Sequence, residues 1–147
     1  MAYCANSDLV KIRANILSLG VTDWADQIAE ADSIINRALE TRWYRQACRE
    51  YELDYREYQF DATLLLNADT QLKRLGTYKT LQLAYIYLAN ETPNPDAFER
   101  QAKNFEKLYS TELADVLAQG VDYDWDESGA LYYTEKRMPS MRRLKRV

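Results

Sequence analysis

The sequence predicts a mainly α-helical protein with a four-helix bundle-like body, a C-terminal β-hairpin and an extended basic tail. Apolar residues recur at steps of three and four through most of residues 1–120, which is the period of an amphipathic helix. The four glycines and three prolines fall mainly where such stretches begin or end. After Gly120 apolar residues alternate with aspartates, a pattern typical of a strand.

Two helices are expected in the first part of the chain. Ser7 is expected to cap the first, which ends at Gly20. Thr22 is expected to cap the second, which runs to about residue 45. The apolar stripe of this second helix consists of Trp24, Ile28, Ala31, Ile35, Ala38 and Leu39.

Residues 46–62 are rich in tyrosine and in charge, and they fit two patterns. Tyr51, Leu53 and Tyr55 alternate with polar residues as in a strand, whereas the aromatic residues of the stretch also keep a helical spacing. We favour a helical extension to about residue 50, followed by an irregular or hairpin-like excursion. The aromatic side chains of this stretch fit core packing and a protein interface equally well.

Two further helices complete the expected body. The third runs from about Asp69 to Ala89, and its second half is apolar nearly all round, so it should be the buried central helix. Asn94 is expected to cap the fourth helix, with Pro95 at the first helical position and Gly120 at the end.

Residues 1–120 are expected to form the helical body, and residues 121–147 a hairpin with a basic docking extension. The hairpin turn is expected at residues 127–129. Residues 1–134 hold 13 Lys and Arg against 22 Asp and Glu, whereas residues 135–147 hold six basic residues and one acidic residue. A charge split of this kind is typical of an interaction arm.

The composition disfavours catalysis. Histidine is absent, which removes the commonest general base and transition-metal ligand. Cys4 and Cys48 are expected to be free thiols outside any nucleophile motif, and no glycine-rich phosphate loop is present. No apolar run is long enough to span a membrane, and the N-terminus lacks a signal-peptide pattern. We therefore predict a non-enzymatic protein made in the cytoplasm.

The aspartates of the expected hairpin suggest a calcium loop. Asp122, Asp124 and Asp126 match the start of such a loop, but Glu127 stands where the loop needs glycine. We favour the solvated polar face of a hairpin instead, and we predict neither a metal nor a cofactor.

Aromatic and basic residues at the C-terminus predict a partner-binding site. Trp125, Tyr132 and Tyr133 lie beside the tail, where a core needs no bulky side chains. The tail could be a solubilising end, a phosphate-binding arm or a docking peptide. Apolar residues recur between its basic residues, which favours a docking peptide. The predicted partner-binding tail residues are Lys136, Arg137, Met138, Met141, Arg142, Arg143, Leu144, Lys145 and Arg146.

Three segments carry a resemblance to the helical head–tail connector proteins, or neck adaptors, of tailed bacteriophages. The opening MAYCANSDLVKI looks like the start of that family, and DQIAEADSIINRALETRWY is similar to its signature helix with an Arg-aromatic pair. The end, VDYDWDESGALYYTEKRMPSMRRLKRV, resembles the Arg-ending extension of several neck proteins. Residues 46–62 depart from the family pattern, in which a shorter connection is expected.

The resemblance implies a homo-oligomeric ring, commonly of twelve copies, that docks beneath the portal in the virion neck. Its implied partners are other copies of the chain, the portal protein and a downstream neck or tail protein. DNA passes through the channel without sequence-specific binding. An alternative is a DNA-binding packaging-initiation module of a phage. Lys11 and Arg13 are the only positive side chains before Arg37, which is few for a recognition helix.

Overall fold

The computed structural model describes residues 2–130, and these residues are mainly helical. A long rod is formed by α2, a five-residue π-helical turn and α3, and two further long helices, α5 and α6, follow it in the chain. The helices are α1 (Asn6–Ile12), α2 (Ala25–Leu39), α3 (Arg45–Glu50), α4 (Ala68–Gln71), α5 (Lys73–Glu91) and α6 (Asp96–Gln119), with the π turn at Glu40–Tyr44 and 3₁₀ turns at Ile16–Ser18 and Ala62–Leu64.

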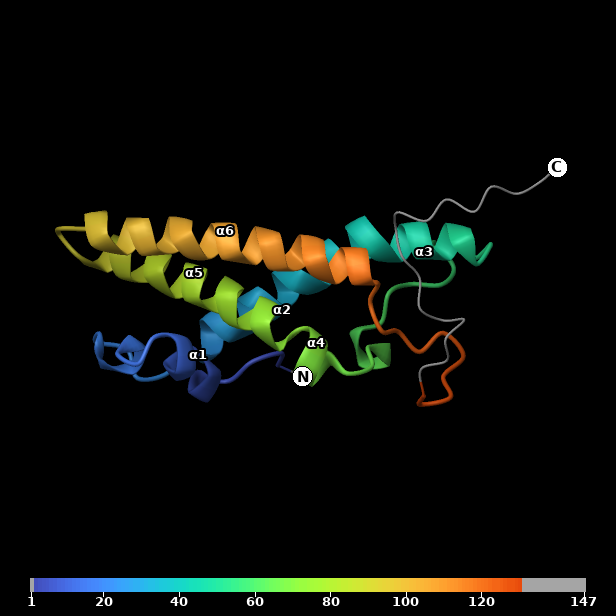
Figure 1. Ribbon diagram of the computed structural model, residues 1–147, viewed down its shortest axis with the longest axis horizontal. Coiled ribbons are helices and arrows are strands. Elements are labelled where there is room, and N and C mark those ends of the chain that lie inside the picture. Colours follow the sequence, from blue (N-terminus) through green and yellow to red (C-terminus); the bar gives the residue numbers. More distant parts are fainter. Residues whose placement is uncertain (1, 131–147) are drawn as a thin grey trace.

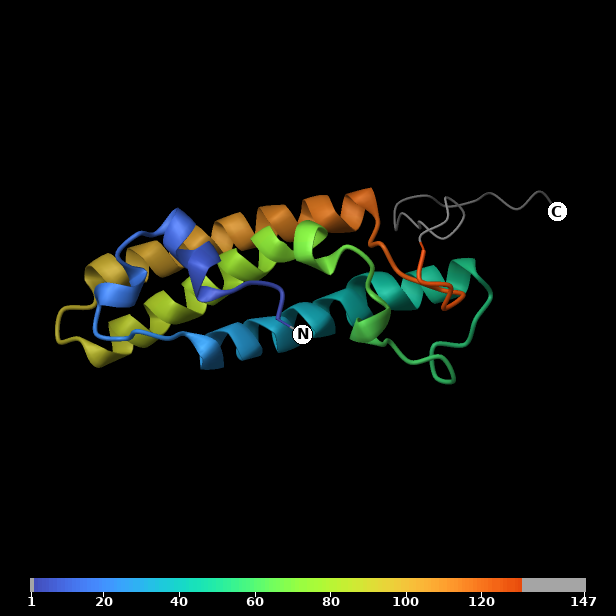
Figure 2. The same cartoon turned by 90° about the horizontal axis from the view of Figure 1, so that it is seen from below.

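The expected mainly α-helical class is confirmed, but the helices are unequal. α5 and α6 form an antiparallel hairpin, α2 packs along it, and α3 extends beyond the end of the hairpin (Figures 1 and 2). α1 is only seven residues long and lies against α5. The body is therefore a bundle of three long rods with a short first helix, because the first predicted helix stops at Ile12 and continues only as a 3₁₀ turn.

The apolar stripes of the long helices form the core, as the helical period predicted. In α2 the buried residues are Ile28, Ala31, Ile35 and Leu39, and in α6 they are Ala102, Phe105, Tyr109, Leu113 and Val116. One cluster of buried residues, which we call the trunk core, joins α1, α2, α5 and α6, and its largest members are Leu9, Ile16, Trp24, Ile28, Leu81, Tyr85, Leu88 and Phe105.

The second helix extends to Glu50, as expected, because the π turn at Glu40–Tyr44 joins α2 to α3 without a break. Trp43 and Tyr44 are neighbours in this turn and both are buried. The rod ends where Glu52 adopts a positive φ of 59°, and an irregular stretch follows it, as predicted.

Two expectations for the third helix need correction. A break at Leu72 separates α4 from α5. α5 is also not buried all round, since Ile86 and Tyr87 are 40% and 41% exposed. α5 is covered where it meets α2 and α6, and another strip of its surface stays exposed. The apolar composition of the sequence does not show which residues of α5 lie on that strip.

The predicted N-caps of the first two helices are wrong by two residues or less. Ala5 precedes α1, and its backbone N–H donates to the Asp8 carboxylate at 3.0 Å. Trp24, not Thr22, stands at the N-cap of α2 and makes no side-chain cap hydrogen bond, while the Asp23 carboxylate beside it accepts the Ala25 N–H at 3.1 Å. A carboxylate accepts these N–H groups more strongly than a hydroxyl does.

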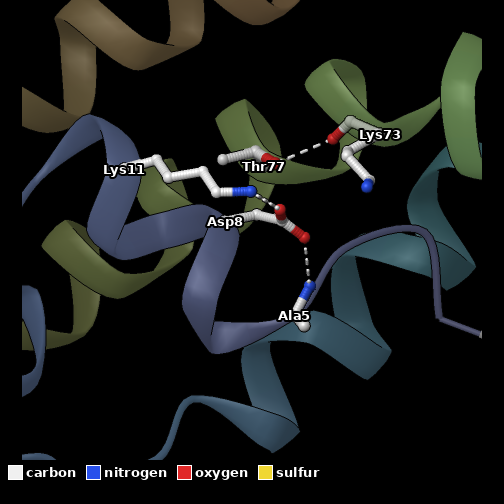
Figure 3. A network of polar contacts seen from close by, with 5 residues as sticks. All are labelled: Ala5, Asp8, Lys11, Lys73 and Thr77. Atoms are coloured by element: carbon white, nitrogen blue, oxygen red, sulfur yellow. Dashed lines mark hydrogen bonds and ion pairs between the residues drawn. The ribbon is translucent and has the colours of Figure 1, made fainter.

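The N-terminal segment lies against α5, where Gly76 allows a close approach and the Cys4 thiol lies 3.5 Å from the Thr80 hydroxyl. A Cβ on Gly76 would lie 3.0 Å from the Tyr3 Cβ, so only glycine allows the two backbones to come so near. Figure 3 shows Asp8 between the Ala5 N–H and Lys11, whose Nζ lies 3.3 Å from the carboxylate. On α5 the Thr77 hydroxyl donates to the Lys73 carbonyl at 2.8 Å.

The predicted C-terminal β-hairpin is not supported. Tyr123 does lie in an extended segment, and within residues 2–130 its pairing is a single antiparallel bridge with Leu65. The alternation of apolar and polar residues therefore correctly indicated an extended segment. Leu65, with which Tyr123 pairs, is distant in the sequence. The predicted second strand, from Leu131, lies outside the described residues.

Candidate protein-interaction site

Six aromatic rings pack together at the end of the bundle where α3 finishes. We call this cluster the aromatic end, and it consists of Trp43, Tyr44, Tyr51, Phe60, Tyr123 and Trp125. Tyr44 and Trp125 stack with ring centroids 5.4 Å apart, and Tyr51 and Trp125 lie 4.7 Å apart. The rings come from three separate stretches of sequence, so this cluster joins the C-terminal segment to the helical bundle.

Hydrogen bonds from residues 64–71 hold the start of the C-terminal segment in place. The Gln71 side chain contacts two backbone groups, because its Nε2 donates to the Gly120 carbonyl at 2.9 Å and its Oε1 accepts the Asp122 N–H at 3.1 Å. The Leu66 N–H donates to the Asp122 carbonyl and the Asp124 N–H to the Leu64 carbonyl, each at 2.9 Å. Residues 120–124 are thus bound to residues 64–71 through backbone groups that burial would otherwise leave unpaired.

The Asp124 carboxylate organises the turn that follows. It accepts the Ser128 N–H at 3.0 Å and the Gly129 N–H at 2.7 Å, and Asp124 is only 5% exposed. Gly129 has a φ of +80°, where a side chain would be strained. The expected solvated face is therefore wrong for Asp124, whose carboxylate is buried as the acceptor that closes this turn, and for Asp122, which is 9% exposed.

Burial keeps the polar groups of the aromatic end uncharged. The Tyr44 hydroxyl donates to the Tyr58 carbonyl at 2.7 Å, and the Tyr123 hydroxyl accepts the Asp61 N–H at 3.2 Å. Desolvation by burial raises the pKa of both tyrosines and also the pKa of the Cys48 thiol. These groups stay protonated at neutral pH and act as packing and hydrogen-bonding groups.

The net negative charge of the body is concentrated around the aromatic end. Within residues 1–134, segments 50–69 and 121–130 hold ten acidic residues and one basic residue, Arg56, while the remaining residues hold twelve of each sign. The ten are Glu50, Glu52, Asp54, Glu57, Asp61, Asp69, Asp122, Asp124, Asp126 and Glu127. Arg42, Arg45 and Arg49 belong to the π turn and α3 at this same end. When residues 40–69 are counted together with 121–130, this end holds eleven acidic and four basic residues, and the rest of residues 1–134 holds eleven acidic and nine basic residues. The end from which the basic tail starts is therefore more acidic than the trunk, which is nearly balanced.

The same end exposes aromatic surface to solvent. Tyr58 is 53% exposed, the highest value among the exposed large hydrophobic residues. The guanidinium groups of Arg45 and Arg56 lie over the ring of Tyr55, 5.2 Å and 6.0 Å from its centroid. Aromatic rings in this loop are thus able to take arginine side chains on their faces.

One of the predicted partner-binding residues lies within the described part of the chain. Trp125 is half-buried in the aromatic end, so it anchors the C-terminal segment rather than standing free on the surface. Its indole Nε1 is buried and has no hydrogen-bond acceptor. The other predicted residues lie outside the described residues: Tyr132, Tyr133, Lys136, Arg137, Met138, Met141, Arg142, Arg143, Leu144, Lys145 and Arg146.

Sequence reasoning missed the residues that position this segment. Gln71 is the last residue of α4 and lies within the expected third helix, where nothing in the local pattern distinguishes it from a solvent-exposed glutamine. The strand-like alternation of Val121, Tyr123 and Trp125 was the available signal, since an extended segment needs backbone partners somewhere in the fold.

Among residues 2–130, no helix is long and apolar enough to cross a membrane. The same residues contain no group of three or more Cys, Asp or Glu placed so as to hold a metal ion. Comparison of the chain with protein-family models, with curated proteins and with solved structures finds no match.

Proposed function

We propose that this protein is a structural subunit of a phage neck, a head–tail adaptor that forms a ring beneath the portal and connects it to the tail. The observation that carries the proposal is the attachment of residues 120–125 to the end of the bundle by Gln71, Trp43 and Tyr44. A docking segment that starts from a fixed base loses less conformational freedom on binding than one that starts from a loose loop.

The distribution of charge supports the same function. A nearly balanced trunk and an acidic end do not attract a passing DNA duplex, whose phosphates would bind a basic channel. The basic tail, with its interleaved apolar residues, then provides a surface for a protein partner. The kind of assembly is inferred from a resemblance to phage neck adaptors. That resemblance lies in the opening segment, the second helix and the C-terminal extension.

Mass photometry of the pure chain, alone and mixed with the portal of the same phage, tests this proposal. We expect rings, or a ring bound to the portal ring, because an adaptor must contact both its own copies and the portal. A strict monomer that ignores its portal would contradict the proposal.

Deletion of residues 135–147 tests the role of the tail. We expect portal binding to be lost while the helical circular dichroism is unchanged, since the bundle core lies within residues 2–125. Unchanged portal binding would contradict the assigned role. A gel shift with duplex DNA at moderate ionic strength serves as a control, and salt-dependent retention of DNA would instead support a packaging module.

A further inference from the structure

We propose that the acidic surface around the aromatic end is the docking site for the basic C-terminal segment of a second copy of this chain. The proposal deepens the proposed function, on which it rests, because it names the contact that joins neighbouring subunits of the ring. Deletion of the tail then abolishes portal binding because the ring that binds the portal no longer forms. A ring needs two different, complementary surfaces on each subunit, since every copy contacts the next in a head-to-tail manner.

The docking surface combines exposed carboxylates with the aromatic cluster. Glu52, Glu57 and Glu127 are all exposed. Glu52 follows Tyr51 in the chain and Glu127 lies two residues after Trp125, and the rings of Tyr51 and Trp125 are 4.7 Å apart. The loop after α3 and the turn after Tyr123 therefore bring acidic side chains from two distant stretches of sequence to one end of the molecule (Figure 1).

The aromatic groups on this surface suit an arginine-rich peptide with apolar residues. Tyr58 is 53% exposed beside Glu57, and the neighbouring Tyr55 ring already carries two guanidinium groups of the same chain. An acidic surface without rings would attract cations in general, whereas this one also fits methionine and leucine side chains.

The C-terminal segment has the matching chemistry and enough length. Residues 135–147 carry six basic residues and one acidic residue, with Met138, Met141 and Leu144 between them. Seventeen residues follow Ala130, and at ~3.3 Å per residue such a segment can span up to ~56 Å when extended. Residues 23–30 at the start of α2 are also acidic, with Asp23, Asp26 and Glu30 exposed, but residues 50–69 and 121–130 hold more acidic residues and add the exposed ring of Tyr58, so the pattern favours the aromatic end of a neighbour.

Charge reversal on both sides of the contact provides the test. One variant carries Glu52→Lys, Glu57→Lys and Glu127→Lys on the acidic surface, and the other carries Arg142→Glu, Arg143→Glu and Lys145→Glu in the tail. Mass photometry of each pure full-length variant should show self-association weakened at least tenfold, and wild-type association should weaken with added salt. A control with Asp26→Lys, Glu91→Lys and Glu112→Lys on the trunk has the same change in charge and should associate like the wild type.

Two combinations make the result specific. All six reversals in one chain should restore association, because the two surfaces are again complementary. A mixture of the two three-site variants should also associate, because the tail of each variant is complementary to the docking surface of the other, whereas neither variant associates alone. Wild-type protein that stays monomeric, or six-fold reversal that fails to restore association, would overturn the inference.

The same variants separate this inference from the proposed function. If the acidic-surface variant still forms rings on the portal, the neighbour contact is refuted while the adaptor function stands. If wild-type chains pair in a charge-dependent way but ignore the portal, the neighbour contact stands and the adaptor function is refuted.

Discussion

The trunk and the aromatic end are held together in different ways. The trunk core consists of apolar stripes on α1, α2, α5 and α6, in which Tyr85 and Phe105 stack 5.7 Å apart. The aromatic end instead joins irregular segments to the π turn and α3. Contacts of Gln71 and Asp124 with backbone groups fix the positions of these segments. Regular helices satisfy their own backbone hydrogen bonds, whereas irregular segments depend on particular side chains to do so.

This difference has a consequence for how each region responds to change. Substitutions in the trunk core should unfold the whole bundle in proportion to the apolar volume removed. Loss of one polar side chain at the aromatic end should release the C-terminal segment while the bundle stays folded. The predictions below compare the two regions, from the largest expected effect to the smallest.

The largest effect is expected from Phe105→Ala in the trunk. Phe105 is 1% exposed and packs against Tyr85 in the middle of the bundle. Removal of a buried phenyl ring should lower the free energy of unfolding by about 3–5 kcal/mol. Denaturant titration followed by circular dichroism measures this change. Leu108→Ala, on the same helix but 38% exposed, is the control and should cost much less; equal losses for the two variants would contradict the assigned core.

Gln71→Leu should have a smaller and local effect. The substitution keeps a similar side-chain volume but removes the partners of the Gly120 carbonyl and the Asp122 N–H. Unpaired buried backbone groups cost about 1–3 kcal/mol. Hydrogen exchange should quicken in residues 120–125, while the exchange of α5 and α6 stays unchanged. Gln119→Leu, at an exposed position, is the matched control; faster exchange throughout the bundle would refute the separation of the two regions.

Asp8→Asn should have the smallest effect, and the effect should depend on pH. The Ala5 N–H, and then the hydrogen bond and charge of Lys11, hold the pKa of Asp8 below its ordinary value of 3.8. The carboxylate therefore stabilises the fold fully above that value, and the contribution is lost as the pH falls through the folded pKa. We expect a loss of about 1 kcal/mol at neutral pH.

Thermal melts of the wild type and of Asp8→Asn at several pH values check this prediction. The two melting temperatures should differ at pH 7 and should converge in acid, where Asp8 is protonated and both side chains are neutral. A difference that stays constant down to pH 2 would show that the carboxylate charge is not responsible.

The helical part of the fold could be predicted from the sequence because its information is local. The stripes of α2 and α6 appear directly as three- and four-residue steps, and Gly120, with a φ of 85°, ends α6 where expected. The exposure of Ile86 and Tyr87 could not be predicted in this way. It depends on where the neighbouring rods lie, and residue spacing within α5 carries no information about that.

The candidate site could be predicted only in part, because its contacts join distant residues. The alternation of Val121, Tyr123 and Trp125 correctly indicated an extended segment, yet within residues 2–130 Tyr123 pairs with Leu65, which is distant in the sequence. Leu65 pairs with Tyr123 because Gln71 and the Trp43 ring of the α2–α3 rod hold the C-terminal segment beside it. The predicted role of the tail residues remains a prediction, since they lie outside the described residues.

The most direct test of the account compares hydrogen exchange of the full-length chain below and above the concentration at which it associates. We predict new protection in residues 50–61 and 121–147, because the acidic surface and the tail form the contact between copies. Residues 73–119 should exchange at the same rate in both states. Protection gained instead around Ile86 and Tyr87 on α5, with none at the aromatic end, would contradict the account.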